Sequence, residues 1–512
     1  MFTKTLLCAV VVWNCFFVEY RLMAALGSGS DFFRCDVLVA DVMHLKGMKN
    51  KGSGKVISCL VDDIMYSLPK HILDLYETEL EDSGRKSISI EGGRLPTMNR
   101  VAGIYPSGEI FAPIGSQVFF QESDSESRTE TSRYKGKKKV LVIRVSALDA
   151  ETTLSQALLS ERIFGDGSDF QQKIPDLPAT TLTKTYKDCS MGRLNFVPAK
   201  GYDIVNGVGV VDIKMNVKNA TCRAVENAVT IEVKRKYGNL EDYDHIMYCL
   251  PAGTVTENMH GWIAYGYMKY YRSNYNDLWC GQNTAVAHEI GHNIGFFHSN
   301  EQAKYQDQTC LMGYSLNFTG GPLMCFNAHK YWTSGWVSDK QIVIKVGREA
   351  WQGSLLAFTD YPVARDGDVV VIHFSDVFFL YNRAKGINSQ VIEKKDKVTV
   401  VQAQYNDSTL LGGLSAGSTM DYKHYRIEIC SFTSDAFGRD YAMLQVTTLK
   451  TFISCTDPNN TSVILSSKPS KMPTLKKAHP TSRPTARARG KTMTPLTNEP
   501  TRGFKTQKPG LE

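Results

Sequence analysis

The strongest constraint in the sequence is the string HEIGHNIGFFH, residues 288–298. On a helix, His288 and His292 lie one turn apart on the same face, so both imidazoles can reach one metal ion. Glu289 directly follows His288, and its carboxylate can reach a water on that metal rather than the metal itself. Gly295 permits a sharp backbone turn that can bring His298 round as a third ligand. Three neutral imidazoles leave a fourth position open to water, as a catalytic zinc site requires.

The competing interpretation is a buried helix whose histidines are satisfied by other protein groups. HExxH alone is a moderate signal, but here a glycine and a third histidine also fall at the required offsets. The flanking residues TAVA and IGFF suit a helix buried beneath a cleft. The sequence therefore predicts one catalytic Zn²⁺ ion held by His288, His292 and His298, with Glu289 as the general base that activates a zinc-bound water.

A second group of residues follows a dozen positions later, in CLMGY, residues 310–314. The order is similar to that of metzincin zinc peptidases, which place a methionine in a tight turn beneath the metal. Met312 followed by Gly313 fits that turn, although a methionine beside a glycine is more often simple core packing. In two metzincin groups, the astacins and serralysins, a tyrosine two residues after the methionine approaches the metal. Tyr314 stands at that offset, either as a stabiliser of the developing oxyanion or as an ordinary aromatic of the cleft wall.

Between about Lys139 and Cys455 the chain resembles the gametolysin (autolysin) family of metzincin peptidases. The resemblance rests on YKDCSMGRLNF, GWIAYGYM, HEIGHNIGFFHS, YQDQTCLMGYS, CFNAHKYWTSGW and LYNRAKGIN. It implies His288, His292 and His298 as ligands, Glu289 as base and Met312 as the turn methionine. It also implies a secreted precursor with an N-terminal pro-region that acts on protein or glycoprotein substrates of the matrix or cell wall.

The pattern of apolar residues predicts an α/β metzincin-like catalytic domain with a mixed, mainly parallel sheet over residues 140–345. Within it, WIAYGYMKYY is typical of an exposed edge strand, along which an extended substrate could bind. Short alternating runs predict a β-rich N-terminal domain over 28–120, which the resemblance makes a pro-domain. Strand follows strand over 346–455, which predicts a C-terminal β-sandwich. The polar stretch 121–139 is expected to be an exposed linker whose basic end, Arg133 to Lys139, is either a processing site or a plain loop.

The N-terminus has the layout of a secretory signal peptide, expected to span residues 1–27. Lys4 precedes the apolar run Leu6 to Val18, which is short for a membrane span, and small residues follow. No later segment is long and apolar enough to span a membrane. The alternatives are a buried strand or a signal anchor.

Cysteines and glycosylation sequons agree with secretion. Ten cysteines remain after the leader, and in an oxidising compartment most would form disulfides. A bridge between Cys310 and Cys325 would stiffen the cleft wall, although ten cysteines allow many pairings. If Cys35 pairs with Cys59, latency by a zinc-bound thiolate is excluded. The sequons, any one of them a weak signal, stand at Asn219, Asn317, Asn406 and Asn459.

The net charge of +7 belongs to a tail rather than to the folded body. Residues 466–512 hold eleven Lys or Arg against two Glu, and seven prolines. We therefore expect no nucleic-acid partner for the folded part, and a disordered basic tail rich in Pro, Ser and Thr. The tail could contact acidic polysaccharide or wall material, although a plain solvated tail is the simpler interpretation.

Two other functions remain open at this stage. One is a catalytically silent adhesion or matrix-binding protein that keeps the fold, which the loss of Glu289 or of a histidine would favour. None of these residues is lost here. The other is an enzyme that uses the same zinc chemistry on a non-protein substrate.

Overall fold

A computed structural model gives the fold of the chain. It describes residues 32–44, 54–81, 85–96, 108–121, 130–147, 150–165, 180–200, 210–213, 221–254, 261–313, 322–346, 350–404 and 407–455. The expected signal peptide, the basic tail, Tyr314 and the four sequon asparagines lie outside the described residues.

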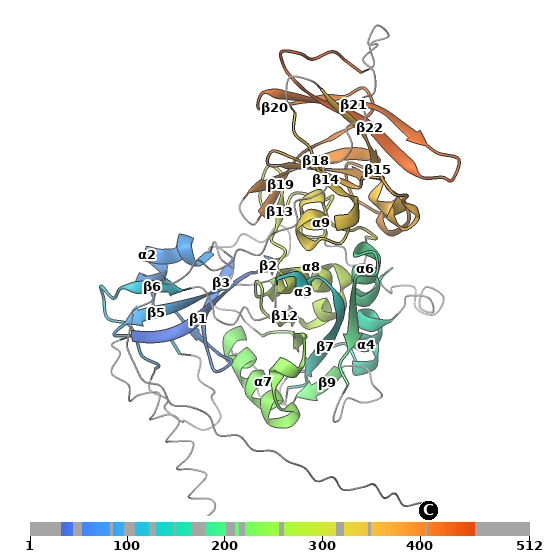
Figure 1. Cartoon of the computed structure of the whole chain (residues 1–512). Helices are drawn as coiled ribbons and strands as arrows, with labels where there is room; N and C mark the ends of the chain where they lie inside the picture. Colours follow the sequence, from blue (N-terminus) through green and yellow to red (C-terminus); the bar gives the residue numbers. More distant parts are fainter. Residues whose placement is uncertain are drawn as a thin grey trace, which may run out of the picture. The chain divides into compact units, whose positions relative to one another are not determined.

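The N-terminal region forms an antiparallel sheet with the order β4-β3-β1-β5-β6 (Figure 1). Its described strands are β1 (Phe32–Asp41), β3 (Lys55–Val61), β4 (Ile64–Ser67), β5 (Arg85–Glu91) and β6 (Val118–Gln121), with helix α2 (Lys70–Glu81). Alternate residues such as Val37, Val39, Ile88 and Ile90 point into one small core. A disulfide between Cys35 and Cys59 joins β1 to β3 across this core.

The central region is a mixed sheet with the order β2-β11-β12-β10-β7-β8, and β9 also pairs with β7. The strands are β2 (Met43–His44), β7 (Gly136–Val145), β8 (Leu194–Pro198), β9 (Val210–Ile213), β10 (His245–Leu250), β11 (Trp262–Gly266) and β12 (Arg272–Asn276). All neighbours from β12 to β8 are parallel, as the near-continuous apolar run 140–145 predicts, whereas β11 runs antiparallel to β12.

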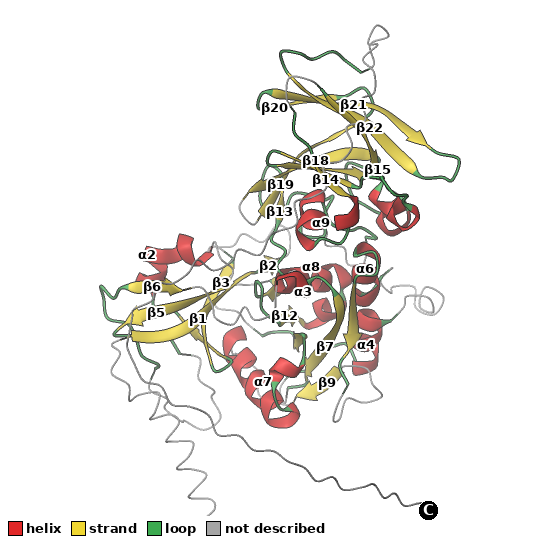
Figure 2. Cartoon of the chain, viewed as in Figure 1, coloured by secondary structure: helices red, strands yellow, loops and turns green. Residues whose placement is uncertain are grey.

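Both faces of the central sheet are covered, because successive side chains of β7 enter two different cores. Val140 and Val142 pack in one core with residues of α4 (Gln156–Phe164), α6 (Leu182–Cys189) and α8 (Asn283–Ile294). Leu141 and Ile143 pack in the other with residues of α7 (Cys222–Tyr237) and of β1. The helices and strands are distinguished by colour in Figure 2.

Two expectations for this region were wrong. Strand β11 is not an exposed edge: its residues are buried, and β2 of the N-terminal region pairs with it antiparallel. The second half of the expected linker is ordered, because residues 130–139 form the short helix α3 (Glu130–Arg133) and the beginning of β7. The lysines at 137–139 look loop-like in sequence because they occupy the solvated start of a strand whose apolar part begins only at Val140.

The C-terminal region has two sheets whose side chains meet in one core. Their orders are β13-β19-β18-β17-β16-β14 and β15-β22-β21-β20. The strands are β13 (Ser299–Asn300), β14 (Gln341–Val343), β15 (Trp351–Leu356), β16 (Val371–Phe374), β17 (Val377–Asn382), β18 (Lys397–Gln404), β19 (Asp407–Leu414), β20 (Thr419–Tyr422), β21 (Tyr425–Ser434) and β22 (Asp440–Thr448), with helix α9 (Ala328–Ser334) between β13 and β14.

The expected boundary between residues 345 and 346 does not separate two structural units. Strands β13 and β14 precede this boundary, yet they pair with β19 and β16 of the C-terminal sheet. Short strands of this kind carry too little sequence signal to be assigned before their partners are known. The segment that directly follows the HEIGHNIGFFH motif therefore pairs with the C-terminal sheet, beginning at Ser299.

Four disulfides lie among the described residues, and one expected pairing was wrong. Cys325 pairs with Cys189 at the end of α6, so the Cys310–Cys325 bridge does not form. Cys310 and Cys222 are buried free thiols. The other bridges join Cys249 to Cys280 and Cys430 to Cys455.

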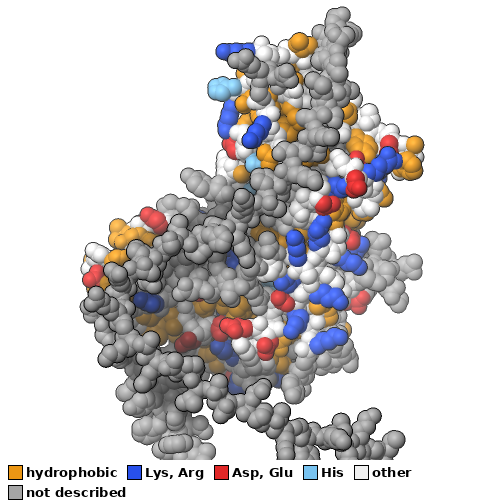
Figure 3. Space-filling view, in the orientation of Figure 1, with side chains coloured by type: hydrophobic (Ala, Val, Ile, Leu, Met, Phe, Trp, Pro, Cys, Tyr) orange, Lys and Arg blue, Asp and Glu red, His pale blue; other side chains and the backbone are white. Residues whose placement is uncertain are grey.

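Among the described residues, no helix combines the length and apolar character needed to cross a membrane. On the face shown in Figure 3, Lys and Arg side chains lie interspersed with Asp and Glu rather than gathered in a field of one sign.

Candidate metal centre

Helix α8 carries His288 and His292 and ends where the chain must change direction to bring His298 toward them. It runs over Asn283–Ile294, and every residue in it is buried. Gly295 ends it with a φ of 107°, a left-handed conformation that glycine adopts without strain. The amide of Phe296 donates to the carbonyl of Gly291 at 2.8 Å, which closes the turn. The chain then continues in a new direction toward His298.

The structure brings the three expected histidines together. One ring nitrogen from each of His288, His292 and His298 lies within 4.8 Å of the other two. The exposed fractions of the three residues are 2%, 0% and 1%. The Nε2 atoms of His292 and His298 are 3.0 Å apart, a separation at which two ring nitrogens share one proton or face one cation.

The outer nitrogen of each ring faces an acceptor. His288 Nδ1 lies 2.8 Å from the carbonyl oxygen of Leu311, and His292 Nδ1 lies 2.8 Å from that of Phe296. A carbonyl oxygen only accepts, so these Nδ1 atoms carry the hydrogens and the Nε2 atoms keep their lone pairs. His298 Nδ1 lies 3.3 Å from Oδ2 of Asp41. Partners of this kind orient metal-binding imidazoles.

Electrostatics keep the imidazoles neutral. Burial, reinforced by the neighbouring His292, lowers the pKa of His288 to about 3. Burial also lowers the pKa of His292 to about 3 and places that of His298 well below its usual range. Neutral imidazole is the form that binds a metal, so the three rings are already in the required state.

Glu289 directly follows His288 on α8, and its carboxylate is free of ordinary hydrogen bonds. The residue is fully buried, and neither carboxylate oxygen has a hydrogen-bond partner of normal geometry among the described residues. Burial raises its pKa well above the ordinary value, although the nearby amide of Gly266 acts in the opposite direction. A buried carboxylate without a partner is costly unless a ligand completes it. Three neutral imidazoles and this acceptor fit a divalent cation with its water.

Met312 lies directly beneath α8, in the tight turn formed by residues 310–313. A Cβ atom added at Gly291 would stand 2.5 Å from Sδ of Met312, so glycine is needed for the close approach. The amide of Gly313 donates to the carbonyl of Cys310 at 2.9 Å, and the carbonyl of Met312 accepts from Ser299 at 2.9 Å. This turn therefore contacts both the helix and the segment that carries His298.

Several residues at the centre were not anticipated from the sequence. Besides Asp41, the Tyr305 ring contacts that of His298 with centroids 4.2 Å apart. Lys330 is 1% exposed and donates through Nζ to the carbonyl of His298 at 3.3 Å. Asp407 accepts from the amide of His298 at 3.0 Å. Only Tyr305 and Lys330 lie within a few dozen residues of the motif, so proximity in sequence could have suggested two of the four.

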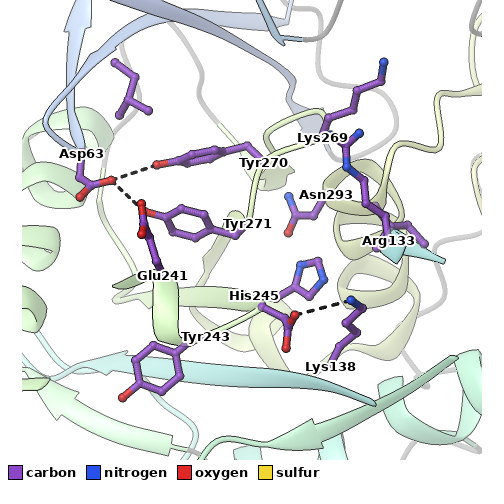
Figure 4. Close-up of a pocket in the computed structure, with 13 residues that line it drawn as sticks. Asp63, Arg133, Lys138, Glu241, Tyr243, His245, Lys269, Tyr270, Tyr271 and Asn293 are labelled. Atoms are coloured by element: carbon purple, nitrogen blue, oxygen red, sulfur yellow. Dashed lines mark hydrogen bonds and ion pairs between the residues drawn. The ribbon is translucent and has the colours of Figure 1, made fainter. Parts of the chain in front are cut away.

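A separate cavity of about 480 Å³ lies on another side of α8 (Figure 4). Tyr271 donates to Asp63 at 3.0 Å, and Lys138 pairs with Asp244 at 3.6 Å. Asn293, the residue after His292, contributes to its wall. No member of the histidine triad is among the described residues that line it, so this cavity is distinct from the metal centre.

Comparison with known protein families agrees with this geometry. Residues 173–372, less than half of the chain, match the sequence model of the family described as Gametolysin peptidase M11. The segment is therefore assigned, by similarity, to the gametolysin peptidases. The family is one of metallopeptidases, so the assignment implies hydrolysis of peptide bonds in a protein substrate with a bound metal. The matched segment contains the whole triad, Glu289 and Met312. A search of curated proteins found no match to the chain.

Proposed function

We propose that this protein is a secreted, zinc-dependent endopeptidase of the metzincin type that cleaves proteins or glycoproteins of the extracellular matrix or cell wall. The observation that carries the proposal is the convergence of three neutral imidazoles beside a buried carboxylate without a hydrogen-bond partner. The central sheet supports the metzincin layout, because β11 runs antiparallel beside five parallel strands and α8 packs against β11 and β12.

The residues of the chain divide the chemistry between them. His288, His292 and His298 would hold the ion through Nε2, and zinc would supply Lewis acidity that polarises the scissile carbonyl and acidifies the attacking water. Glu289 takes the proton of that water and delivers it to the leaving amine. Burial raises the pKa of Glu289, so its carboxylate is a stronger base toward the proton of that water. Met312 supports α8 from beneath.

The substrate would bind along β11, and the N-terminal region occupies that position in the full chain. Met43 and His44 pair with Ala264 and Trp262 of β11, and Met268 donates its amide to the carbonyl of Val39. An extended peptide needs the same edge for its main-chain hydrogen bonds. This arrangement supports a pro-region over 28–120 that must leave before a substrate can bind. The Cys35–Cys59 bridge argues against latency through a cysteine bound to zinc.

Secretion rests on independent features of the chain. An apolar leader begins the sequence, four sequons are present, and four disulfides cross-link the described residues. Disulfides of this number are typical of oxidising compartments. Met312 in the turn role, Tyr314 as an oxyanion stabiliser and glycans at the sequons remain predictions.

The test is hydrolysis of casein or gelatin by the zinc-loaded protein after removal of the N-terminal region. We expect the wild-type protein to cleave, and Glu289→Gln to lose at least about 100-fold in kcat/KM, the lower range for a general acid–base residue, while it keeps its zinc. A chelator should abolish the activity and zinc should restore it. If the zinc-loaded, processed wild-type protein cleaves neither substrate, the peptidase proposal fails and a silent binding protein becomes the better interpretation.

A further inference from the structure

The C-terminal sheet reaches the metal centre through the third histidine. His298 is followed at once by β13, and β13 pairs in parallel with β19, with Ser299 opposite Ser408 and Asn300 opposite Thr409. More than one hundred residues separate the two strands in the sequence. The first two histidines need no such support, because α8 fixes their spacing.

Both backbone polar groups of His298 are held by residues outside its own segment. Its amide donates to Oδ1 of Asp407 at 3.0 Å. Its carbonyl accepts from the amide of Ser408 at 3.1 Å and from Nζ of Lys330 at 3.3 Å. A hydrogen bond to a carboxylate is stronger than one between neutral groups, so Asp407 is the firmest of these anchors.

The anchoring residues are themselves fixed. Ser408 and Ser299 are fully buried, and Asn327 donates through Nδ2 to Oγ of both, at 3.0 and 3.1 Å. Asn300 donates to the second oxygen of Asp407 at 3.2 Å. Asn327 lies outside the segment that carries His298, so it holds Ser408 independently of that segment.

Local structure alone does not place His298. Gly295 ends the helix, and residues 296–298 belong to no helix or strand. Without β19, this segment would have to be ordered when the metal binds, and the ordering entropy would reduce the affinity.

We propose that Asp407 and Ser408 of the C-terminal sheet are positioning residues of the metal centre, which fix His298 so that zinc affinity depends on them. This inference rests on the proposed function, because it assumes that the triad binds zinc. It makes the C-terminal sheet part of the metal site rather than an appended binding module.

The experiment measures the zinc dissociation constant of the full chain by competition with a chromogenic chelator. Loss of groups that orient a ligand commonly weakens metal binding about 10–100-fold, and we expect Asp407→Ala to do so. Asp407→Asn keeps an oxygen that accepts from the His298 amide, so its affinity should stay within about threefold of wild type. Because this change also creates a sequon with Thr409, the variants are expressed without N-glycosylation. Leu414→Ala is the matched control, because Leu414 lies on the same strand but packs in the core between the two C-terminal sheets. It should lower the melting temperature without changing the zinc affinity.

A second variant keeps the inference testable if Asp407→Ala does not fold. Ser408→Ala removes the hydroxyl that Asn327 holds, and it should weaken zinc binding by a smaller factor. Asn406, Asp407 and Ser408 also form a glycosylation sequon. Asn406→Gln removes the sequon alone, so it controls for a lost glycan and should bind zinc as the wild type does.

The outcomes separate the two claims. If the wild type binds no zinc, the proposed function fails. Suppose that the wild type binds zinc. If the zinc dissociation constant of a folded Asp407→Ala is within twofold of the wild-type value, the positioning role is wrong and the metal site stands. The same conclusion follows if Leu414→Ala weakens zinc binding as much as Asp407→Ala does. If Asp407→Ala does not fold and Ser408→Ala binds zinc as Asn406→Gln does, the positioning role is also wrong.

Discussion

Gly291 and Met312 should show strong energetic coupling, because glycine alone leaves room for the methionine beneath α8. A Cβ atom at Gly291 would stand 2.5 Å from Sδ and 3.2 Å from Cε of Met312, and 3.2 Å from the hydroxyl of Tyr186. Overpacking of this kind costs about 1–3 kcal/mol. Alanine is a better helix former than glycine by roughly 1 kcal/mol, which offsets part of that cost. We expect Gly291→Ala to lower the free energy of unfolding by about 0–2 kcal/mol.

The effect of Gly291→Ala on stability should change sign when Met312 is also replaced by alanine. Met312 is fully buried, so Met312→Ala alone should cost about 2–5 kcal/mol. In that background the clash with the thioether is gone, and only the Tyr186 hydroxyl has to shift by a few tenths of an ångström. Gly291→Ala should then be neutral or stabilising by up to about 1 kcal/mol. The coupling energy is therefore about 1–3 kcal/mol.

Urea unfolding of the metal-free protein measures these differences without a contribution from zinc binding. Hydrogen exchange of the α8 amides reports the same free energies locally, which matters in a chain of several regions. Met247→Ala is the matched control, because Met247 is fully buried in the same core but lies on β10. If Gly291→Ala is equally destabilising in the wild-type, Met312→Ala and Met247→Ala backgrounds, Met312 does not occupy the space beneath the helix.

Three further predictions follow from the described contacts. Replacing both Cys189 and Cys325 by alanine should lower the free energy of unfolding by about 2–5 kcal/mol. Peptide mapping of the unreduced wild-type protein should recover a disulfide-linked peptide that contains Cys189 and Cys325. A peptide that links Cys310 to Cys325 would contradict the structure. Zinc at about one hundred times its dissociation constant should stabilise the protein by about 2.7 kcal/mol in calorimetry or urea titration, and His292→Ala should abolish that increment; an equal increment in the variant would place the metal elsewhere. Removal of residues up to 129 should increase hydrolysis of a short peptide by the zinc-loaded protein, because β2 then no longer covers β11; equal rates for the full and shortened chains would mean that the N-terminal region does not block the site.

The convergence of the three histidines was largely predictable because His288 and His292 are close in sequence and lie on one helix. The spacing of His288, Glu289 and His292 is fixed by the helical repeat, and Gly295 indicates the turn that follows. The contacts of His298 with Asp41 and Asp407 could not be predicted in this way. Each joins residues more than one hundred positions apart, and nothing in the local pattern marks them.

The errors in the fold have similar causes. Cys310 and Cys325 are close in sequence, but Cys189 reaches Cys325 from α6, and sequence distance says little about which thiols meet. The aromatic strand β11 resembles an exposed edge until β2 covers it.

X-ray absorption at the zinc edge of the loaded, full-length protein tests the central claim most directly. Three imidazole nitrogens at about 2.0–2.1 Å and one oxygen ligand at a similar distance are expected, and His298→Ala should reduce the imidazole count to two. A sulfur shell at about 2.3 Å, or an unchanged imidazole count in the variant, would contradict an ion held by His288, His292 and His298.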